Sequence, residues 1–327
     1  PDWLVYHTNI TGDWEIFRLG ELPGNPDADV NLSKGVGFRV SDVAPSRSPD
    51  GGWITFASTR DGNWEVYVGT TDGEFQQRVT YNETAIDVDP VWSPTGSSIA
   101  FESGRDGNWN LYIVDVATGV ERQLTDHPAN DINPFWSADG TKIVFQSDRD
   151  GLWQIYELDV ATLETRRISD GSGDDHDPQY SFDMTKIAFR SYRDGENSVI
   201  YVMDVDGSNV TQISDPAGDA TNHAWSEDDA LLAYQSNLDG DKDIYVHEFE
   251  TELTRLLTDN TIDDYAPTWL CAAPTIVFTS DITGDSNIFS TNALPINAPA
   301  ILVEEEANQM TFDPAADQYP QNTPPEE

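Results

Sequence analysis

Short segments in which apolar and polar residues alternate recur along the whole chain, and each ends at a turn rich in Gly, Pro, Asp or Ser. Alternation over so few residues, with Val, Ile, Phe, Tyr and Trp enriched, predicts β-strands. No amphipathic helical stretch of useful length occurs. Residues 87–125 therefore predict four strands, DVDPVW, SSIAFES, WNLYIVDV and VERQLT, joined by the turns SPTG, GRDGN and ATG.

The turn between the second and third predicted strands belongs to a phrase that recurs seven times. Its glycines follow one another at intervals of 50, 45, 44, 44, 45 and 44 residues. A repeat of this length made of short strands indicates a β-propeller with one four-stranded blade per repeat. We therefore expect one all-β domain with seven blades. The copies are TGDWEIF (11–17), DGNWEVY (61–67), DGNWNLY (106–112), DGLWQIY (150–156), DGENSVIY (194–201), DGDKDIY (239–245) and TGDSNIF (283–289).

The two ends of the chain complement each other. PDWLVYH at the start corresponds to a second strand, so the first blade lacks an innermost strand. Residues 317–320 repeat the pattern of residues 87–90, and we expect 317–322 to supply the missing strand to the blade begun by 1–19. Such a "Velcro" pairing of the N- and C-terminal segments leaves no exposed sheet edge. The domain is thus expected to span 1–320, with 321–327 as a tail or linker stub.

The repeat D-x-x-P-x-W-S-P-D-G…I-x-F-x-S-x-R-D-G-N-x-E-I-Y…R-x-L-T resembles the WD-repeat-like β-propeller repeat of TolB-type proteins. Residues 87–125 follow the pattern throughout, and the resemblance covers essentially the whole chain. The resemblance implies the propeller fold. Relatives with such repeats include envelope proteins that bind other proteins, propeller domains attached to peptidases, and pectate-fragment lyases. The resemblance therefore leaves both binding and catalysis open.

The net charge of the chain restricts the classes of partner that it can bind. The 327 residues include 17 Lys and Arg but 59 Asp and Glu, a formal net charge of −42. Phosphate contacts need Lys and Arg, so we expect no nucleic-acid partner, and the acidic surface is repelled by anionic membranes. No apolar run is long enough for a membrane-spanning helix. Such acidity favours cations or cationic partners, calcium loading outside the cell, or adaptation to high salt.

The cysteine count and the start of the chain bear on the redox chemistry and the cellular compartment of the protein. Cys271 is the only cysteine, which excludes an internal disulfide and a multi-cysteine metal site. The chain starts without a signal peptide, as expected of a cytoplasmic protein or of a processed export product. Acids spread over all blades incline us to an extracellular or periplasmic protein.

Acidic residues recur in the loop that leads into each innermost strand, here called the lead-in loop. An Asp stands three residues before the strand's Pro at Asp42, Asp87, Asp131, Asp175, Asp264 and Asp317. A structural role is favoured for these residues, because such an Asp can accept backbone N–H groups and pair with Arg60, Arg105, Arg149 or Arg193 of the hairpin.

The residue one position before the Pro differs from blade to blade. A structural role shared by all blades therefore explains the choice of residue at this position less well. We predict a cation or ligand site there, at the mouth of the central channel; the alternative is a solvated acidic rim. The predicted ligand-binding residues are Asp89, Asn133, His176, Asp177, Asn222 and His223.

A second candidate site lies at two hairpin tips, where oxygen-bearing side chains alternate around a Gly. The predicted metal ligands are Asn237, Asp239, Asp241 and Asp243 on one tip, and Asp281 and Asp285 on the next. Hard oxygen ligands suit Ca²⁺, although the Gly position excludes an EF-hand loop. The alternative is an ordinary Asp-Gly hairpin. No organic cofactor is expected.

Tryptophans mark the same end of four consecutive repeats, at Trp14, Trp64, Trp109 and Trp153. One interpretation is packing between blades. The other is an aromatic arc beside acids that receives a cationic peptide or a sugar.

Catalytic motifs are absent from the sequence: it holds no G-x-S-x-G, H-E-x-x-H or phosphate loop. The leading hypothesis is a non-catalytic binding module of an exported protein, stabilised by Ca²⁺. Its partner would be a protein, a cationic peptide, a glycan, or other domains of the same polypeptide. The runner-up is a metal-dependent polysaccharide lyase or hydrolase that uses His176 and His223.

Overall fold

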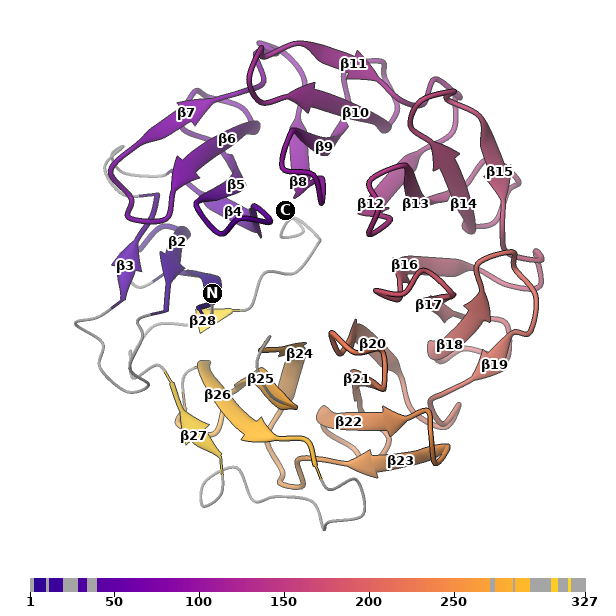
Figure 1. Ribbon diagram of the computed structural model, residues 1–327. Coiled ribbons are helices and arrows are strands. Elements are labelled where there is room, and N and C mark those ends of the chain that lie inside the picture. Colours follow the sequence, from indigo (N-terminus) through magenta and orange to yellow (C-terminus); the bar gives the residue numbers. More distant parts are fainter. Residues whose placement is uncertain are drawn as a thin grey trace. The chain divides into compact units, whose positions relative to one another are not determined.

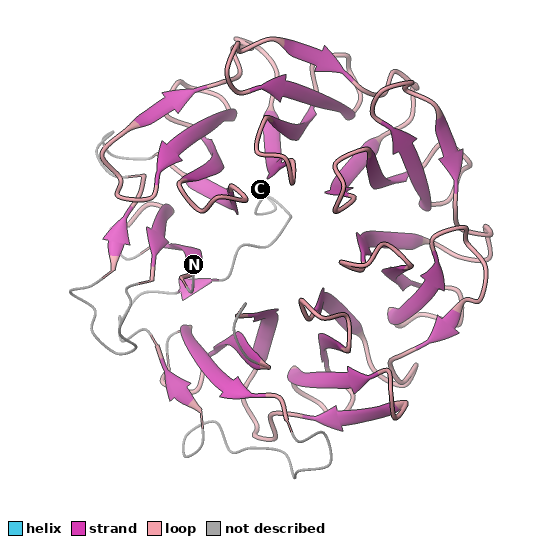
Figure 2. Cartoon of the chain, in the orientation of Figure 1, coloured by secondary structure: helices cyan, strands magenta, loops and turns pink. Residues whose placement is uncertain are grey.

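The computed structural model describes residues 3–9, 12–19, 29–33, 40–270, 274–284, 286–294, 307–310 and 317–318. Its strands form seven four-stranded antiparallel sheets, and these described ranges contain no helix (Figures 1 and 2). The sheets are the blades of a seven-bladed β-propeller, as the sequence predicted. No described helix is long and apolar enough to cross a membrane.

Six of the sheets each contain the strands of one sequence repeat, with the first strand on one edge and the fourth on the other. The first three complete blades are β4 (Asp42–Arg47), β5 (Trp53–Ser58), β6 (Glu65–Thr70) and β7 (Gln76–Arg78); β8 (Asp87–Trp92), β9 (Ser98–Ser103), β10 (Asn110–Asp115) and β11 (Glu121–Gln123); β12 (Asp131–Trp136), β13 (Lys142–Ser147), β14 (Gln154–Asp159) and β15 (Thr165–Arg167).

The next three blades follow the same order. They are β16 (Asp175–Tyr180), β17 (Lys186–Ser191), β18 (Val199–Asp204) and β19 (Thr211–Gln212); β20 (Ala220–Trp225), β21 (Leu231–Ser236), β22 (Asp243–Glu248) and β23 (Leu253–Leu256); β24 (Asp264–Trp269), β25 (Thr275–Ser280), β26 (Asn287–Asn292) and β27 (Asn308–Gln309).

The remaining sheet has the strand order β28-β1-β2-β3. Its strands are β1 (Val5–Thr8), β2 (Glu15–Arg18), β3 (Val30–Asn31) and β28 (Asp317–Gln318). The C-terminal segment thus provides the strand beside β1, as the sequence predicted. The rest of the expected strand 317–322, the tail 321–327 and Cys271 lie outside the described residues, and the limits of the domain at 1–320 stay a prediction.

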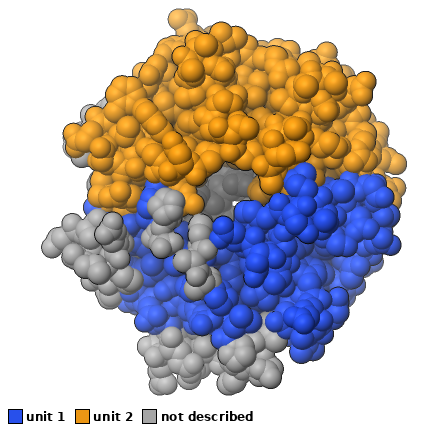
Figure 3. Space-filling model, viewed as in Figure 1, with its two compact units in different colours: residues 1–4, 19–29, 181–319 blue, residues 5–18, 30–180, 320–327 orange. Residues whose placement is uncertain are grey.

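Figure 3 colours two compact units of the chain. One unit comprises Pro1–Leu4, Leu19–Asp29 and Ser181–Tyr319, and is called unit 1 below. The other, unit 2, comprises Val5–Arg18, Val30–Tyr180 and Pro320–Glu327.

The core of each blade follows from the alternation of its middle strands. Phe101 on β9 pairs with Tyr112 on β10, and their rings stack 5.9 Å apart. Phe56 with Tyr67, and Phe145 with Tyr156, repeat this pair. The phenylalanines are completely buried, because period-two alternation directs them toward the packed face of the sheet.

The innermost strands carry a β-bulge. In β8 the register shifts between Val88 and Val91, which leaves Asp89 with positive φ. A bulge re-aims the side chain of the extra residue. Asp and Asn tolerate this left-handed conformation better than most residues. The residues at this position are Ala44, Asp89, Asn133, Asp177, Asn222 and Ala266, with φ between 48° and 55°.

Candidate ligand and cation sites

The structural role predicted for the Asp three residues before the Pro, which the structure places at the first position of the innermost strand, is confirmed in three blades. Asp87 accepts a hydrogen bond from Ser103 Oγ, and Arg105 Nη2 lies 2.9 Å from its Oδ2. The Asp87 N–H donates to the Trp64 carbonyl, which joins consecutive blades. The same ion pair joins Asp42 to Arg60 and Asp131 to Arg149. These carboxylates are therefore structural.

The bulge residues of unit 2 form a hydrogen-bonded row. The Asn133 N–H donates to Glu102 Oε1 at 2.6 Å, and the Asp177 N–H donates to Gln146 Oε1 at 2.9 Å. Asn133 Nδ2 in turn donates to Asp177 Oδ1 at 2.8 Å. The structure thus brings the predicted residues Asn133 and Asp177 into direct contact.

Two carboxyl groups are buried together at one end of this row. Asp89 is 7% exposed and Glu102 is 5% exposed. Burial raises the pKa of Asp89 to about 8. Burial, and then the charge of Asp89, raise the pKa of Glu102 well above its ordinary value. Among the described residues, Asp89 Oδ1 has no hydrogen-bond partner.

The fold does not require this buried charge. Ala44 and Ala266 hold the same backbone conformation without a polar side chain, and Asn133 and Asn222 hold it with a neutral one. A buried carboxyl without a compensating partner costs free energy. Such perturbed groups gather at functional sites, so Asp89 and Glu102 are the strongest ligand-site candidates in unit 2.

Glu102 and Gln146 were not predicted from the sequence. The available signal is a polar residue next to the last Ser of an otherwise apolar second strand, as in SIAFES and KIVFQS. This polar residue gains a hydrogen-bonding role because the bulge of the following blade brings a backbone N–H to its side chain.

The other predicted ligand residues divide between the units. In unit 2, His176 is half-buried, with its ring 5.9 Å from that of Trp153. In unit 1, Asn222 Nδ2 donates to Gln235 Oε1 at 3.0 Å, and His223 is buried. A combined site of all six residues stays a prediction.

The tryptophans of unit 2 take part in packing. Trp14, Trp64 and Trp109 pack against a buried cluster of Val43, Ala44, Ala57 and Val88. These three residues and Trp153 are half-buried. The packing interpretation is supported, and a role in ligand binding stays a prediction.

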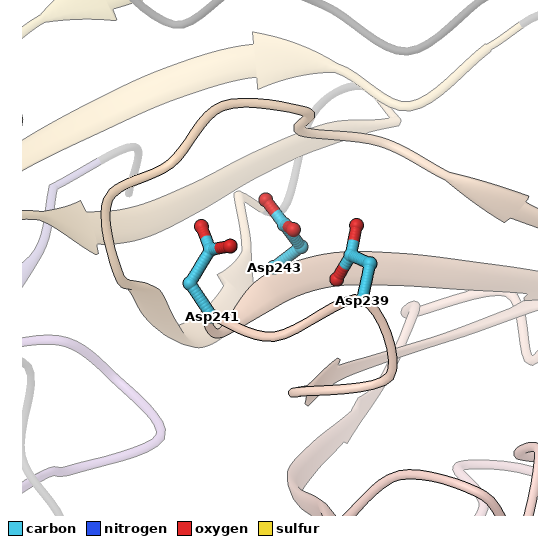
Figure 4. A group of neighbouring side chains, drawn as sticks. All are labelled: Asp239, Asp241 and Asp243. Carbon is cyan, nitrogen blue, oxygen red and sulfur yellow. The ribbon is translucent and has the colours of Figure 1, made fainter.

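Three of the predicted metal ligands gather in unit 1. One carboxylate oxygen from each of Asp239, Asp241 and Asp243 lies within 4.8 Å of the others. Figure 4 shows the three carboxylates on the same side of the loop that leads into β22. Asn237 instead accepts the Asp219 N–H, and Asp281 accepts the Ser286 hydroxyl. Asp285 lies outside the described residues.

This acidic group is electrostatically strained. Burial above all, and then the charges of Asp239, Asp241 and Asp264, raise the pKa of Asp243 to about 8. Burial also raises the pKa of Asp264 to about 6. Asp243 is completely buried, and its Oδ2 has no hydrogen-bond partner among the described residues. Such a group can be stabilised by protons or by a bound cation.

The family of the chain follows from its sequence. The profile of the TolB beta propeller domain matches residues 31–108, 87–177 and 176–318. The chain therefore belongs to the TolB β-propeller family. No curated protein matches it.

Solved structures share the fold at low sequence identity. TolB from Acinetobacter baumannii is 21% identical with a TM-score of 0.55, over 80% of this chain and 62% of TolB. An oligogalacturonate lyase in complex with manganese is 19% identical with a TM-score of 0.66, over 89% of this chain and 81% of the lyase. A prolyl endopeptidase is 12% identical with a TM-score of 0.71, over 98% of this chain but 49% of the enzyme. At these identities the likeness shows the fold alone.

Proposed function

We propose that the chain is a non-catalytic binding module that recognises a positively charged segment of a partner protein through unit 2. The observation that carries this proposal is the buried pair Asp89 and Glu102, whose charge the bulge does not require. A cationic group of a partner would favour the ionised form of these carboxyl groups and pair with it, as buried carboxylates generally need.

The surroundings of the pair fit such a ligand. Asn133 and Asp177 are half-exposed and continue the row by hydrogen bonds, so polar groups connect the buried pair to the surface. The half-buried residues Trp64 and Trp109 would add aromatic contacts to ammonium or guanidinium groups, or to the apolar faces of sugars. A net charge of −42 accelerates the approach of a cationic partner.

Location and cofactor belong to the same proposal. Membership of the TolB propeller family and the acidic surface support an extracellular or periplasmic protein. Calcium bound at the hairpin of Asp239, Asp241 and Asp243 would stabilise it. The partner segment can also come from another domain of the same polypeptide.

The test uses a labelled oligolysine peptide and fluorescence anisotropy. The site variant combines Asp89→Asn with Asp177→Asn, because Asn occupies the same bulge position in two other blades. The control combines Asp115→Asn with Asp159→Asn, the last residues of β10 and β14, whose replacement removes the same charge. The site variant should weaken binding about tenfold or more, equivalent to about 1.4 kcal/mol, and the control much less. Equal losses in both variants would mean unspecific attraction and would contradict the proposal.

A second candidate function is a metal-dependent polysaccharide lyase or hydrolase that uses His176 and His223. Its support is the shared fold with the oligogalacturonate lyase in complex with manganese. The one group of three or more potential metal ligands among the described residues contains neither histidine. Product release from acidic glycans with added Mn²⁺, lost on His176→Ala, would favour this function. Release unaffected by that substitution, or none from a broad glycan panel, would reject it.

A further inference from the structure

In two blades the outermost strand supplies an arginine that neutralises the hairpin acids of its own blade, whereas the blades of β10, β18 and β26 have a glutamine at that register. On β7, Arg78 lies opposite Tyr67, 3.1 Å from Asp61 and 2.5 Å from the completely buried Glu65. On β15, Arg167 lies opposite Tyr156, 3.0 Å from Asp150. In these two blades a guanidinium at this register therefore serves as the counter-charge of the hairpin.

The blade of β20–β23 keeps the acids but loses this cation. Leu256 on β23 lies opposite Tyr245, at the register of Arg78. Asp239 and Asp243 stand where that blade has Asp61 and Glu65, and Asp241 adds a further carboxylate. Thr258 donates to Asp243 Oδ1 at 3.1 Å, as Thr80 donates to Glu65, so the local geometry is retained while the counter-charge is missing.

A neighbouring carboxylate has lost its cation as well. Asp264 begins β24 as Asp42 begins β4, but Ile282 stands where Arg60 pairs with Asp42. The Asp264 N–H donates to the Lys242 carbonyl at 2.6 Å, so the backbone of Asp264 lies next to the residue between Asp241 and Asp243, although its carboxylate is not one of the three that lie within 4.8 Å of one another. Asp264 is completely buried, and its Oδ1 has no hydrogen-bond partner among the described residues.

Lys242 does not replace the missing cations. Its Nζ lies 3.9 Å from Asp263 and 5.7 Å from the centre of the Tyr265 ring, and the Lys242 side chain is about half exposed. The charged groups that act on Asp243 are carboxylates.

We infer that Asp239, Asp241 and Asp243 bind a divalent cation, Ca²⁺, with Asp264 as a further ligand, and that this cation takes the place of the arginines that pair with the corresponding acids in other blades. Carboxylate oxygens are the ligands of Ca²⁺, and its variable coordination suits ligands from a turn and two strands. The inference rests on the proposed stabilisation by calcium and names Asp264 as the ligand contributed by the next blade. The unpartnered Oδ2 of Asp243 is the second, independent indication of a ligand.

The test is calorimetric titration of the chelator-treated full chain with CaCl₂ and MgCl₂, with NaCl of equal ionic strength as the reference. We expect saturable Ca²⁺ binding that Asp243→Asn weakens about tenfold or more, because charge count sets affinity in such sites. Leu256→Arg should abolish binding while raising the melting temperature of the calcium-free protein, since it restores the counter-charge of the repeat. Asp106→Asn, at the equivalent of Asp239 in the blade of β8–β11, should leave binding unchanged.

Each outcome decides the inference. Absent Ca²⁺ binding, or binding that survives both Asp243→Asn and Leu256→Arg, overturns it. If the variants fold poorly, Leu256→Arg still discriminates, because it predicts a gain in stability without calcium. The oligolysine experiment on Asp89 and Asp177, run with chelator present, tests the binding module separately, so failure of one does not imply failure of the other.

Discussion

Arg60 Nη2 lies 3.0 Å from Asp42 Oδ1, with only 8% and 1% of the two side chains exposed. The guanidinium also lies over the Tyr67 ring, 4.5 Å from its centre. Arg105 and Arg149 repeat both contacts, so the R-D-G tip of the repeat joins the hairpin to the lead-in loop. In the blade of β20–β23 both members change together, to Leu238 and Ala220. In the blade of β24–β27, by contrast, Asp264 is retained and Ile282 stands in the place of the arginine, which leaves a buried carboxyl group without its cation.

Breaking one such pair should be costly, and removing both partners much less so. Arg149→Leu leaves the completely buried Asp131 without its cation and should lower the free energy of unfolding by about 3–5 kcal/mol. Adding Asp131→Ala recreates the residues found at Leu238 and Ala220 and should recover part of the loss. Urea unfolding of the two variants measures this coupling. A double variant less stable than Arg149→Leu would show that Asp131 stabilises the fold through contacts other than its ion pair with Arg149.

Much of the fold could be predicted because the same sequence pattern recurs along the chain. The recurring Gly and aromatic positions predicted the seven blades, and the match of residues 317–320 to 87–90 predicted the strand beside β1. The pairing of Asp87 with Arg105 followed from hairpin and lead-in loop recurring together. Each of these features can be recognised by comparing the sequence pattern of one repeat with that of the others.

The partners of the candidate sites could not be predicted in the same way. Strict alternation says nothing of the bulge between Val88 and Val91, which places Asp89 beside Glu102. Asp264 was not among the predicted metal ligands, because it belongs to a different repeat from Asp243. The only signal was Ile282 in the place of an arginine, a loss that has meaning once the ion pairs of the other blades are known.

The buried carboxyl of Asp89 should make stability fall as pH rises. Its pKa is about 8 in the folded protein and 3.8 ordinarily, so between these values the folded state binds a proton that the unfolded state does not. Stability from this group is complete at low pH and is lost toward pH 8, with a slope of up to about 1.4 kcal/mol per pH unit. Asp89→Asn should flatten the dependence, since it also removes the charge that faces Glu102. Urea unfolding between about pH 5 and about pH 8, with chelator present, measures the slope.

The control for this experiment is Asp115→Asn. Hydrogen bonds from Thr118 lower the pKa of Asp115, so this group stays ionised throughout the measured range. The slope of that variant should equal that of the unmodified protein. An unchanged slope in Asp89→Asn as well would show that the carboxyl of Asp89 is not the titrating group.

Substitutions of Trp109 can distinguish a packing role of the tryptophans from a role in ligand binding. Its indole packs on the cluster that includes Val43 and Val88, so Trp109→Ala should lower the free energy of unfolding by about 3 kcal/mol. Trp109→Phe keeps most of that packing and should cost less. Denaturant unfolding measures both variants. A Trp109→Ala protein as stable as the unmodified chain would show that the indole is not needed for packing and would favour a role in ligand binding.

Gly218 should be needed for the hairpin that carries Asp239. A Cβ at this position would lie 2.6 Å from the Cα and 2.7 Å from the backbone nitrogen of Leu238, distances that the backbone can relieve only by moving. Hydrogen bonds between Asp219 and Asn237 hold the two segments together, so the strain of Gly218→Ala reaches the hairpin directly. We expect a loss of about 1–3 kcal/mol in the free energy of unfolding and weaker Ca²⁺ binding. Gly104→Ala is the matched control, because its Cβ would meet its nearest neighbour at an ordinary 3.9 Å. If both substitutions change stability and calcium affinity equally, the close approach of Gly218 to Leu238 does not position the cation ligands.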